Sequence, residues 1–409
     1  MQISFSPPDI SEAEIEGVVE VLKSGWITTG PKTKRLEEEI AALCGAGRAV
    51  CLSSATAALE TTLRILGVGP GDEVVTSAYT YTASASVINH VGARIVLADT
   101  DPDSFHLSAG RIEPLLNERT KAVIPVDIGG VFCDYPALME TVKAKAGLFR
   151  PAGRLQEALG RIAVIADAAH AFGSTAGGVP AGGFADFTCF SFHAVKCPTT
   201  AEGGAVVWKT LPGIDDGEIY RAYMLHSLHG QTRDALAKLA PGVWEYDIEF
   251  CGRKCNMTDI AAAIGLGQLR RLPALIARRR QIVELYDAAL LGRGLVSLPH
   301  GRGGMESNGH LYLARLPGKN EEQRNRVIAD MAQAGIGVNV HFKPLPLMTA
   351  YKKLGFAIAD FPNAYNQYRN EISLPLHTLL TDEQVAYTAR TLLALYERPE
   401  SGGGTGAGR

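Results

Sequence analysis

The chain has 409 residues, of which 46% are hydrophobic and 20% charged, and its formal net charge is −3. This composition fits a globular protein of two domains, and the charge gives no reason to expect nucleic acid or an anionic membrane as a partner. No apolar run reaches the roughly 18 residues that cross a bilayer, and the N-terminus lacks the features of a signal peptide. The seven scattered cysteines argue against a disulfide framework or a zinc site. We therefore expect a cytoplasmic protein without a metal site.

The first predicted element is a capped helix over residues 11–24. Ser11 and Glu14 form the pattern of a capping box, and apolar residues at helical spacing follow them. The loop 26–31 carries two threonines and an aromatic residue, and on its own it is compatible with a simple connector. A second helix is expected over residues 34–43.

A short strand over residues 49–52 leads into small and hydroxyl-bearing residues, 53–58, that begin a helix. Backbone N–H groups, hydroxyl donors and the helix dipole at such a start can hold a phosphate. The same residues also make an ordinary N-cap, and the segment taken alone favours this simpler interpretation.

Further strands are predicted over residues 73–76, 95–99 and 122–126, with a helix over 83–91. This alternation predicts a mostly parallel sheet with helices on both faces. Tyr81 follows the first of these strands. The pattern is as compatible with a tyrosine of the core as with one that faces a ligand.

Asp167 follows an apolar strand over residues 162–166. A carboxylate is therefore expected at the carboxyl end of a parallel strand, where open α/β sheets bind ligands. An aspartate at a strand end can also be a turn residue.

Lys196 lies in a polar turn between apolar strands over residues 187–192 and 205–208. A poorly hydrated lysine has a lowered pKa, and its neutral amine can form a Schiff base; the alternative is a surface lysine in a hairpin loop. Pyridoxal phosphate (PLP) needs a lysine for its aldehyde and an acidic partner for its pyridinium nitrogen. Asp167 and Lys196 together therefore predict a PLP enzyme.

The C-terminal part begins with a long helix that starts within residues 251–265, continues to about residue 290 and links two domains. A strand over 311–316, a helix over 320–334, a strand over 337–342 and a helix over 382–396 then predict a small α+β domain. We expect a large PLP-binding domain with an N-terminal arm (1–265), the linking helix with the small domain (266–398), and a disordered Gly-rich tail (399–409).

Three segments, Asp167-Ala168-Ala169-His170, Ser191-Phe192-His193-Ala194-Val195-Lys196 and Glu202-Gly203-Gly204, resemble motifs of the DegT/DnrJ/EryC1/StrS sugar aminotransferases. The resemblance extends from about Ser6 to about Leu395. It implies the aspartate-aminotransferase fold (fold type I), PLP as cofactor, and a homodimer with shared active sites. The motifs are most similar to the 4-amino-4-deoxyarabinose transaminases, which act at C4 of a UDP-4-keto sugar.

The resemblance also implies roles for individual residues. Lys196 would hold PLP and carry the proton, and Asp167 would keep the pyridine nitrogen protonated. The remaining cofactor contacts implied are with the phosphate, the ring and its hydroxyl: Ala55, Thr56, Ala57, Ser191, Tyr81 and His170. In the family, a segment Gly-Tyr-Asn-Tyr-Arg-Met reaches the phosphate site of the partner subunit. Residues 253–256 replace its inner four residues in this chain. Lys254 and Asn256 are therefore the candidates for that contact. Substrate-side positions are Thr29, His229 and His341.

The implied reaction moves an amino group from glutamate to a nucleotide-linked keto sugar, at C4 of a UDP-4-keto sugar. A C3 aminotransferase of the same family and a PLP-fold protein that binds or regulates without turnover are the alternatives. Lys196 argues against the family's dehydratases, in which a histidine replaces the lysine. A nicotinamide-binding oxidoreductase would have the motif G-x-G-x-x-G after the first strand, and this motif is absent there. Residues 135–161 are longer than the family's usual crossover and are expected to be a solvated surface crossover with one added helix or loop.

Overall fold

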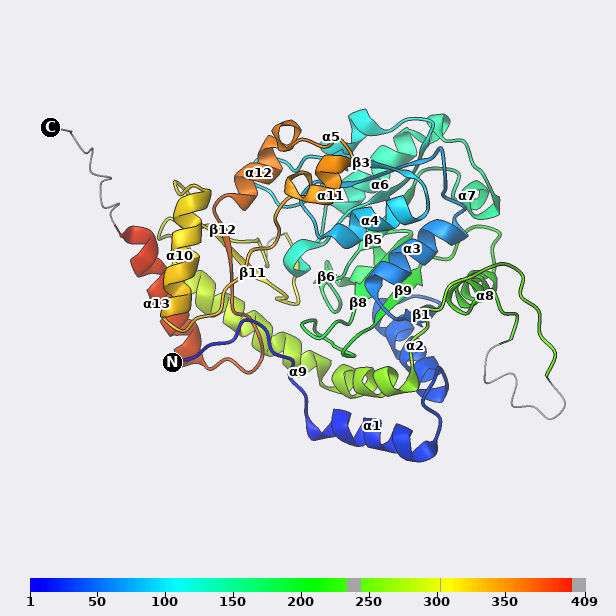
Figure 1. Cartoon of the computed structure of the whole chain (residues 1–409), viewed down its shortest axis with the longest axis horizontal. Helices are drawn as coiled ribbons and strands as arrows, with labels where there is room; N and C mark the ends of the chain where they lie inside the picture. Colours follow the sequence, from blue (N-terminus) through cyan, green and yellow to red (C-terminus); the bar gives the residue numbers. More distant parts are fainter. Residues whose placement is uncertain (234–243, 302, 399–409) are drawn as a thin grey trace.

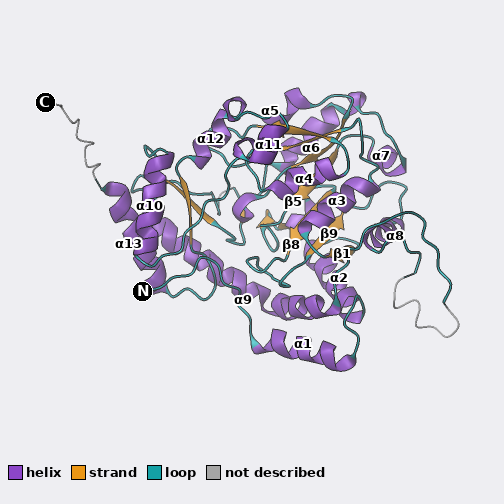
Figure 2. Cartoon of the chain, viewed as in Figure 1, coloured by secondary structure: helices purple, strands orange, loops and turns teal. Residues whose placement is uncertain are grey.

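The computed structural model describes residues 1–233, 244–301 and 303–398, and a seven-stranded sheet lies at its centre (Figures 1 and 2). In the order β1-β9-β8-β5-β4-β2-β3, its strands are β1 (Ala49–Leu52), β9 (Gly204–Trp208), β8 (Phe187–Ser191), β5 (Ala163–Asp167), β4 (Thr120–Ile124), β2 (Glu73–Ser77) and β3 (Arg94–Ala98). The strands from β8 to β3 are parallel, and β9 is antiparallel to both of its neighbours. All seven were predicted, with ends displaced by at most two residues.

Helices cover both faces of this sheet (Figure 2). One face packs against α3 (Ala55–Ile65), α4 (Thr82–His90) and α8 (Asp216–Ser227). The other packs against α2 (Pro31–Cys44) and α9 (Asp259–Leu290) at one end, and α5 (Ala109–Ile112) and α6 (Tyr135–Ala144) at the other. Burial on both faces explains why apolar residues predominate in the parallel strands.

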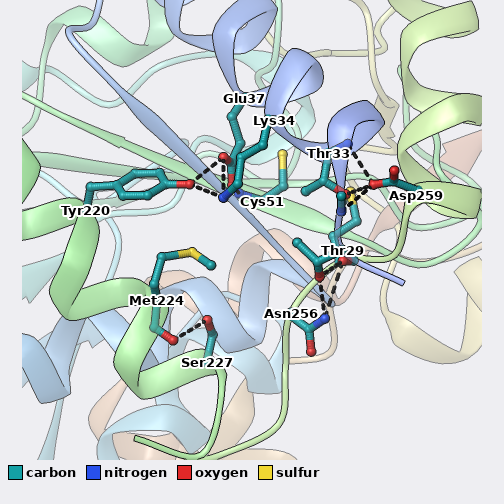
Figure 3. A network of polar contacts seen from close by, with 12 residues as sticks. Thr29, Thr33, Lys34, Glu37, Cys51, Tyr220, Met224, Ser227, Asn256 and Asp259 are labelled. Carbon is teal, nitrogen blue, oxygen red and sulfur yellow. Dashed lines mark hydrogen bonds and ion pairs between the residues drawn. The ribbon is translucent and has the colours of Figure 1, made fainter. Parts of the chain in front are cut away.

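The capping box of α1 (Glu12–Ser24) is confirmed, because the N–H of Ser11 donates to the Glu14 carboxylate at 2.7 Å. Helix α2 begins three residues before the predicted start. Asp259, at the start of α9, accepts hydrogen bonds from the N–H groups of Gly30 (2.7 Å) and Thr33 (2.9 Å), as Figure 3 shows for Thr33. A carboxylate from a distant part of the chain thus caps this helix, which the local sequence does not reveal.

Strand β1 lies at an edge of the sheet, and polar groups cover it. The Glu37 carboxylate accepts from the N–H of Cys51 at 3.0 Å and from the Tyr220 hydroxyl at 2.8 Å (Figure 3). The N–H of Ser53 donates to the carbonyl of Cys255 at 2.8 Å. The segment around Cys255 therefore runs beside β1 and closes an edge that would otherwise expose unpaired backbone groups.

The interpretation of residues 135–161 as a solvated crossover with one added helix or loop was wrong. The segment forms two helices, α6 and α7 (Arg154–Leu159). Leu138 and Val142 of α6 are buried in the core, and Gln156 of α7 donates to the carbonyl of Leu66 at 2.7 Å. The prolines and glycines separate two packed helices, and do not mark an open loop.

The C-terminal part contains a two-stranded antiparallel sheet of β11 (Tyr312–Arg315) and β12 (Glu371–Leu374). Helices α10 (Glu321–Gln333) and α13 (Asp382–Glu397) pack with it. The remaining short elements are β6 (Thr175–Ala176), β7 (Val179–Pro180), β10 (Met305–Glu306), α11 (Thr349–Lys353) and α12 (Pro362–Tyr368).

The predicted strand over residues 337–342 does not form. Gly337 donates to Ile3 at 2.8 Å on one side, and Asn339 exchanges hydrogen bonds with Ser373 on the other. The N–H of His341 is taken by the Glu371 side chain, at 3.0 Å, and not by a neighbouring backbone. Single bridges to different partners cannot build a ladder, although the segment lies extended between them.

Helix α9 joins two separate cores (Figure 1). Its first half, including Leu266 and Ile276, packs against α2 and the central sheet. Its second half, from Ile282 to Leu290, packs against β11, β12, α10 and α13. We keep the two-domain division as a proposal and place its boundary inside α9, between residues 276 and 282. The proposed tail, 399–409, lies outside the described residues.

Helix α9 is also long and apolar enough, by length and composition, to cross a membrane, and it is alone in this among the residues described. Polar residues such as Gln268 and Arg270 interrupt its apolar sequence, which is why it does not appear as a run. In its most apolar window 56% of the residues are buried inside the protein, and it contacts α1, α2 and α13. These are the properties of a core helix.

Candidate active site

A cavity of about 400 Å³ opens at the carboxyl ends of the central strands. Its walls come from the N-terminal arm, the start of α3, the loop before α4, the ends of β5 and β8, and the segments before β11 and after residue 340. The lining residues that carry polar or aromatic side chains include Phe5, Ser54, Thr56, Tyr81, Asp167, His170, Ser191, His193, Lys196, Glu202, His310, His341 and Phe342. Parallel α/β sheets bind their ligands at this edge.

Lys196 lies in the turn between β8 and β9 and lines the cavity, so it is not a lysine of an open hairpin loop. Its Nζ is 3.4 Å from Nε2 of His310. Burial lowers the pKa of Lys196 to about 8; the negative charge of Asp167 opposes this shift, and the positive charge of Arg279 adds to it. Near neutral pH the neutral, nucleophilic amine is therefore far more populated than in a free lysine, although the protonated form still predominates.

Asp167 is the last residue of β5 and is only 5% exposed. Its carboxylate accepts a hydrogen bond from the Ser84 hydroxyl at 2.7 Å and from the N–H of Ala169 at 3.2 Å. Burial raises the pKa of Asp167, while these two donors and the charge of Lys196 oppose the shift. The side chain is thus a fixed, buried acidic partner inside the same cavity as the lysine.

Ser84, on α4, was not predicted from the sequence. Its hydroxyl joins Asp167 to Thr80, whose Oγ1 lies 2.8 Å from the Ser84 Oγ. The only available signal was a serine in the first turn of a helix that follows a strand. Such serines are common, and the contact exists because α4 crosses the end of β5.

The variant Ser84→Ala should lower the free energy of unfolding of the apoprotein by about 1–3 kcal/mol at neutral pH, because it leaves a buried carboxylate with one donor fewer. Urea unfolding of the apoprotein measures this loss. Ser86→Ala is the matched control, since the Ser86 hydroxyl makes only a 3.4 Å contact with a carbonyl of its own helix. Equal stability of the two variants would show that Ser84 does not support Asp167.

Two histidines lie against each other beside the lysine, with their rings tilted by 45°. The ring centroids of His170 and His310 are 4.4 Å apart, and burial lowers the pKa of both well below the usual value. Nδ1 of His170 accepts from the N–H of Gly129 at 3.2 Å, so the neutral ring carries its hydrogen on Nε2. A neutral donor suits the role predicted for His170, beside the ring hydroxyl of PLP.

His310 lines the cavity and was not predicted from the sequence. The Arg279 guanidinium donates to the carbonyls of Gly309 (3.3 Å) and His310 (3.4 Å), and Asn308 donates to the carbonyl of His170 at 2.9 Å. These bonds hold the segment before β11 against Lys196. A histidine one or two residues before a strand carries no distinctive pattern, so the sequence alone could not identify it.

The start of α3 forms one end of the cavity, as predicted. Ser54, Ala55 and Thr56 line it, and the first N–H groups of a helix have no partner within the helix. A Cβ on Gly204 would lie 2.4 Å from the nitrogen of Ala55, so this glycine permits the close approach of β9. Ala57 does not line the cavity, and its N–H donates to Ser54 Oγ at 3.0 Å. The segment is therefore an N-cap and also a possible phosphate cradle.

Tyr81 and Ser191 also line the cavity. Tyr81 is 61% exposed, with its ring 6.0 Å from that of Phe342, so the alternative of a core tyrosine is wrong. The neighbouring Tyr79 is the buried one. Ser191 ends β8, and its hydroxyl accepts from the N–H of His193 at 3.4 Å.

Four predicted residues do not line this cavity but lie together beyond the edge of β1. Thr29 donates to the carbonyl of Met257 at 2.5 Å, and Asn256 donates to the Thr29 hydroxyl (Figure 3). Lys254 in turn donates to Asn256. The N–H of His229 donates to the carbonyl of Arg253, at 2.7 Å, beside this group. His341, in contrast, lines the cavity.

The cavity fits PLP on observations of this structure: a lysine with a lowered pKa, a buried carboxylate opposite it, a helix start brought close by a glycine, and an exposed aromatic ring. With the mostly parallel sheet and the small C-terminal domain, these features define a PLP-dependent enzyme of fold type I.

Residues 8–393 match the model of the DegT/DnrJ/EryC1/StrS aminotransferase family. The chain belongs to this family. It is 37% identical over 387 residues to the spore coat polysaccharide biosynthesis protein SpsC of Bacillus subtilis, covering 94% of each chain.

Solved structures agree with this assignment, and together with the family match they confirm the predictions of fold, enzyme class and cofactor. The putative sugar aminotransferase Spr1654 of Streptococcus pneumoniae, in its pyridoxamine phosphate (PMP) form, has a TM-score of 0.95 and 52% identity, over 97% of this chain and 99% of that one. PseC of Helicobacter pylori, an aminotransferase involved in the biosynthesis of pseudoaminic acid, has a TM-score of 0.85 and 28% identity, over 97% and 100% of the two chains.

Proposed function

We propose that the enzyme moves an amino group from glutamate to a nucleotide-linked keto sugar, at C4 of a UDP-4-keto sugar. The observation that carries the transfer chemistry is the pairing of Lys196 with Asp167 in one cavity. The sugar acceptor is supported by the relatives, whose names refer to a sugar aminotransferase, to pseudoaminic acid and to spore coat polysaccharide. A role in polysaccharide biosynthesis follows as part of the same proposal.

The residues at the mouth of the cavity are suited to a polyhydroxylated substrate. His193 and Glu202 lie on opposite sides of Lys196 along one loop, with their side chains 3.6 Å apart, and both line the cavity. Tyr81 and His341 line it too. Imidazoles, a carboxylate and a phenol can hydrogen-bond sugar hydroxyls in several directions.

When bound, PLP supplies an aldehyde that takes up the amino group and a ring that accepts electron density. Asp167 would hold the pyridine nitrogen in its protonated form, and the N–H of His170 would donate to the ring hydroxyl. Ser54, Ala55, Thr56 and Ser191 would hold the phosphate. Lys196 would then move the proton as general base and acid, for which a pKa of about 8 is well matched to neutral pH.

We also propose that the enzyme is a homodimer and that Thr29, His229, Lys254 and Asn256 serve the partner subunit's active site. The support is that these four form a polar group outside the cavity of their own chain. We keep the cytoplasm as the proposed location, because the seven cysteines are free thiols and five of them are buried.

Absorbance spectra of the purified protein, with and without glutamate, test the first half of this function. We expect bound PLP to absorb at roughly 410–430 nm and the band to move to about 330 nm when glutamate is added. Addition of a UDP-4-keto sugar should then restore the first band. Restoration by a 3-keto sugar alone would select the C3 alternative, and a protein that stays unchanged with glutamate would select a binding protein without turnover.

A further inference from the structure

Behind the cavity, three side chains form a continuous hydrogen-bonded chain that ends at His341. Nδ1 of His341 is 2.8 Å from the hydroxyl of Ser373, and the same hydroxyl is 2.5 Å from Oε1 of Glu371. Ser373 and Glu371 are both completely buried on β12, two residues apart and therefore on one side of the strand. Neither residue was identified from the sequence.

The position of the His341 ring is fixed from several directions. Phe5 of the N-terminal arm stacks on it, with ring centroids 5.6 Å apart, and Phe342 meets it edge-on. The backbone N–H of His341 donates to Oε2 of Glu371 at 3.0 Å, and its backbone carbonyl accepts from the Tyr79 hydroxyl at 2.8 Å. Since Nδ1 is engaged by Ser373, Nε2 is the ring nitrogen left for a ligand in the cavity.

The hydrogen on Nε2 depends on Glu371, because a serine hydroxyl has a single hydrogen. If Glu371 is ionised, Ser373 donates to it and accepts from Nδ1–H, so Nε2 presents a lone pair. If Glu371 is protonated, it donates to Ser373, Ser373 donates to Nδ1, and Nε2–H faces the cavity. One proton on a buried carboxyl therefore sets the direction of the whole chain.

The groups around this chain keep the histidine neutral and let the carboxyl hold its proton. Burial and the charge of Lys196 lower the pKa of His341 to about 4. Burial raises the pKa of Glu371 to about 8. The hydrogen bonds from Ser373 and from the backbone N–H of His341, and then the charge of Arg324 of α10, oppose this shift without cancelling it. Arg315, opposite Glu371 on β11, is engaged by Asp103 and Asn370. At neutral pH the chain therefore runs from Glu371 to Nε2.

We propose that Glu371, acting through Ser373, is a positioning residue that presents the Nε2–H of neutral His341 to an oxygen atom of the keto-sugar acceptor. The inference rests on the proposed function, since it assigns His341 to the acceptor and not to glutamate. It separates the two halves of the reaction: the Glu371–Ser373–His341 chain serves the sugar and leaves the glutamate half unaffected.

Two variants test the proposal. Ser373→Ala breaks the chain and should raise the KM for the keto sugar roughly 2- to 10-fold, the effect of one hydrogen bond, with the spectral reaction with glutamate unchanged. Glu371→Gln keeps a donor toward Ser373 and imitates the protonated acid. It should keep the KM of the wild type at neutral pH.

The pH dependence gives a sharper readout. In the wild type, the KM for the keto sugar should rise as pH increases through about 8, where Glu371 loses its proton. In Glu371→Gln this rise should disappear. Lys196 titrates in the same range, but its effect also appears in the glutamate reaction, which both variants retain.

A measurement without turnover completes the test. Side-chain ¹⁵N spectra of the histidine-labelled protein at neutral pH, with His341 assigned through His341→Gln, should show hydrogen on Nε2 in the wild type and in Glu371→Gln. Ser373→Ala should show a mixture of the two tautomers. An unchanged KM in Ser373→Ala, or a wild-type rise of KM with pH in Glu371→Gln, would overturn the inference. A wild-type enzyme that reacts with glutamate but accepts no keto sugar would overturn the proposed function instead.

Discussion

The variant Lys196→Ala is expected to retain the fold and to bind PLP without a covalent bond. Its turnover should fall by a factor of roughly 10²–10⁴ or more, the contribution of one group that transfers a proton. The amine of Lys196 lies inside the cavity, and burial lowers its pKa to about 8, so it is suited both to attach the aldehyde and to carry the proton. Reduction with borohydride, followed by peptide mass spectrometry, should place the phosphopyridoxyl group on Lys196 of the wild type.

Two controls separate the chemistry of this lysine from its charge and from lysine loss in general. Lys196→Arg keeps a positive charge but cannot become a neutral amine in the physiological range, so it should fail in the same way as Lys196→Ala. Lys352→Ala removes an exposed lysine of α11 and should behave as the wild type. Covalent PLP on another lysine in Lys196→Ala, together with turnover, would disprove the assignment.

The rate at which the apoprotein captures PLP should follow the neutral fraction of Lys196. Below a pH of about 8 the amine is mostly protonated and unreactive, and above it the amine is mostly neutral. The capture rate should therefore rise with pH and level off above this midpoint. A free lysine would show the midpoint near 10.4, so the displacement measures the effect of the cavity.

The central sheet could be predicted from the sequence because its strands are short apolar runs that alternate with helices. Asp167 and Lys196 stand at the ends of two such runs, so their shared location followed from the topology of a parallel sheet. Ser84 and His310 could not be found in this way. Each reaches the site from an element whose packing angle, and not its local sequence, decides what the side chain contacts.

Strand β12, which the sequence analysis did not predict, shows a different limit. Glu371 and Ser373 point into the protein, so the usual alternation of apolar inward and polar outward residues is absent. The segment around His341, by contrast, has the alternation of a strand but distributes its backbone bonds between Ile3 and Ser373. Both errors arise where polar residues are buried to form a site, which is where patterns of hydropathy are least informative.

The variant Asp167→Asn should reduce turnover roughly 10²–10³-fold, a loss typical of removing one electrostatic group from an active site. The amide has the size of the carboxylate and can still accept a hydrogen bond, but it carries no negative charge to hold a proton on the pyridine nitrogen. PLP should still attach to Lys196, so the amount of attached cofactor should stay close to that of the wild type while turnover falls. Borohydride labelling and steady-state rates measure the two effects on the same preparation.

The same substitution should also displace the titration of Lys196. The negative charge of Asp167 raises the pKa of this lysine, so its removal should bring the pKa below about 8. PLP capture should then become faster at neutral pH, in the opposite direction to turnover. An unchanged midpoint would mean that Asp167 does not act on the lysine through its charge.

Stability provides the control that distinguishes lost chemistry from lost folding. Burial raises the pKa of Asp167 above its value in the unfolded chain, so the folded state binds this proton more tightly. Stability should fall as pH rises from the unfolded pKa through the folded one, and the cost of the buried charge is fully present above that window. Asp167→Asn removes this cost, so at neutral pH the variant apoprotein should be at least as stable as the wild type. An inactive but fully stable Asp167→Asn protein would therefore assign the loss to the cofactor's electrostatic partner and not to the fold.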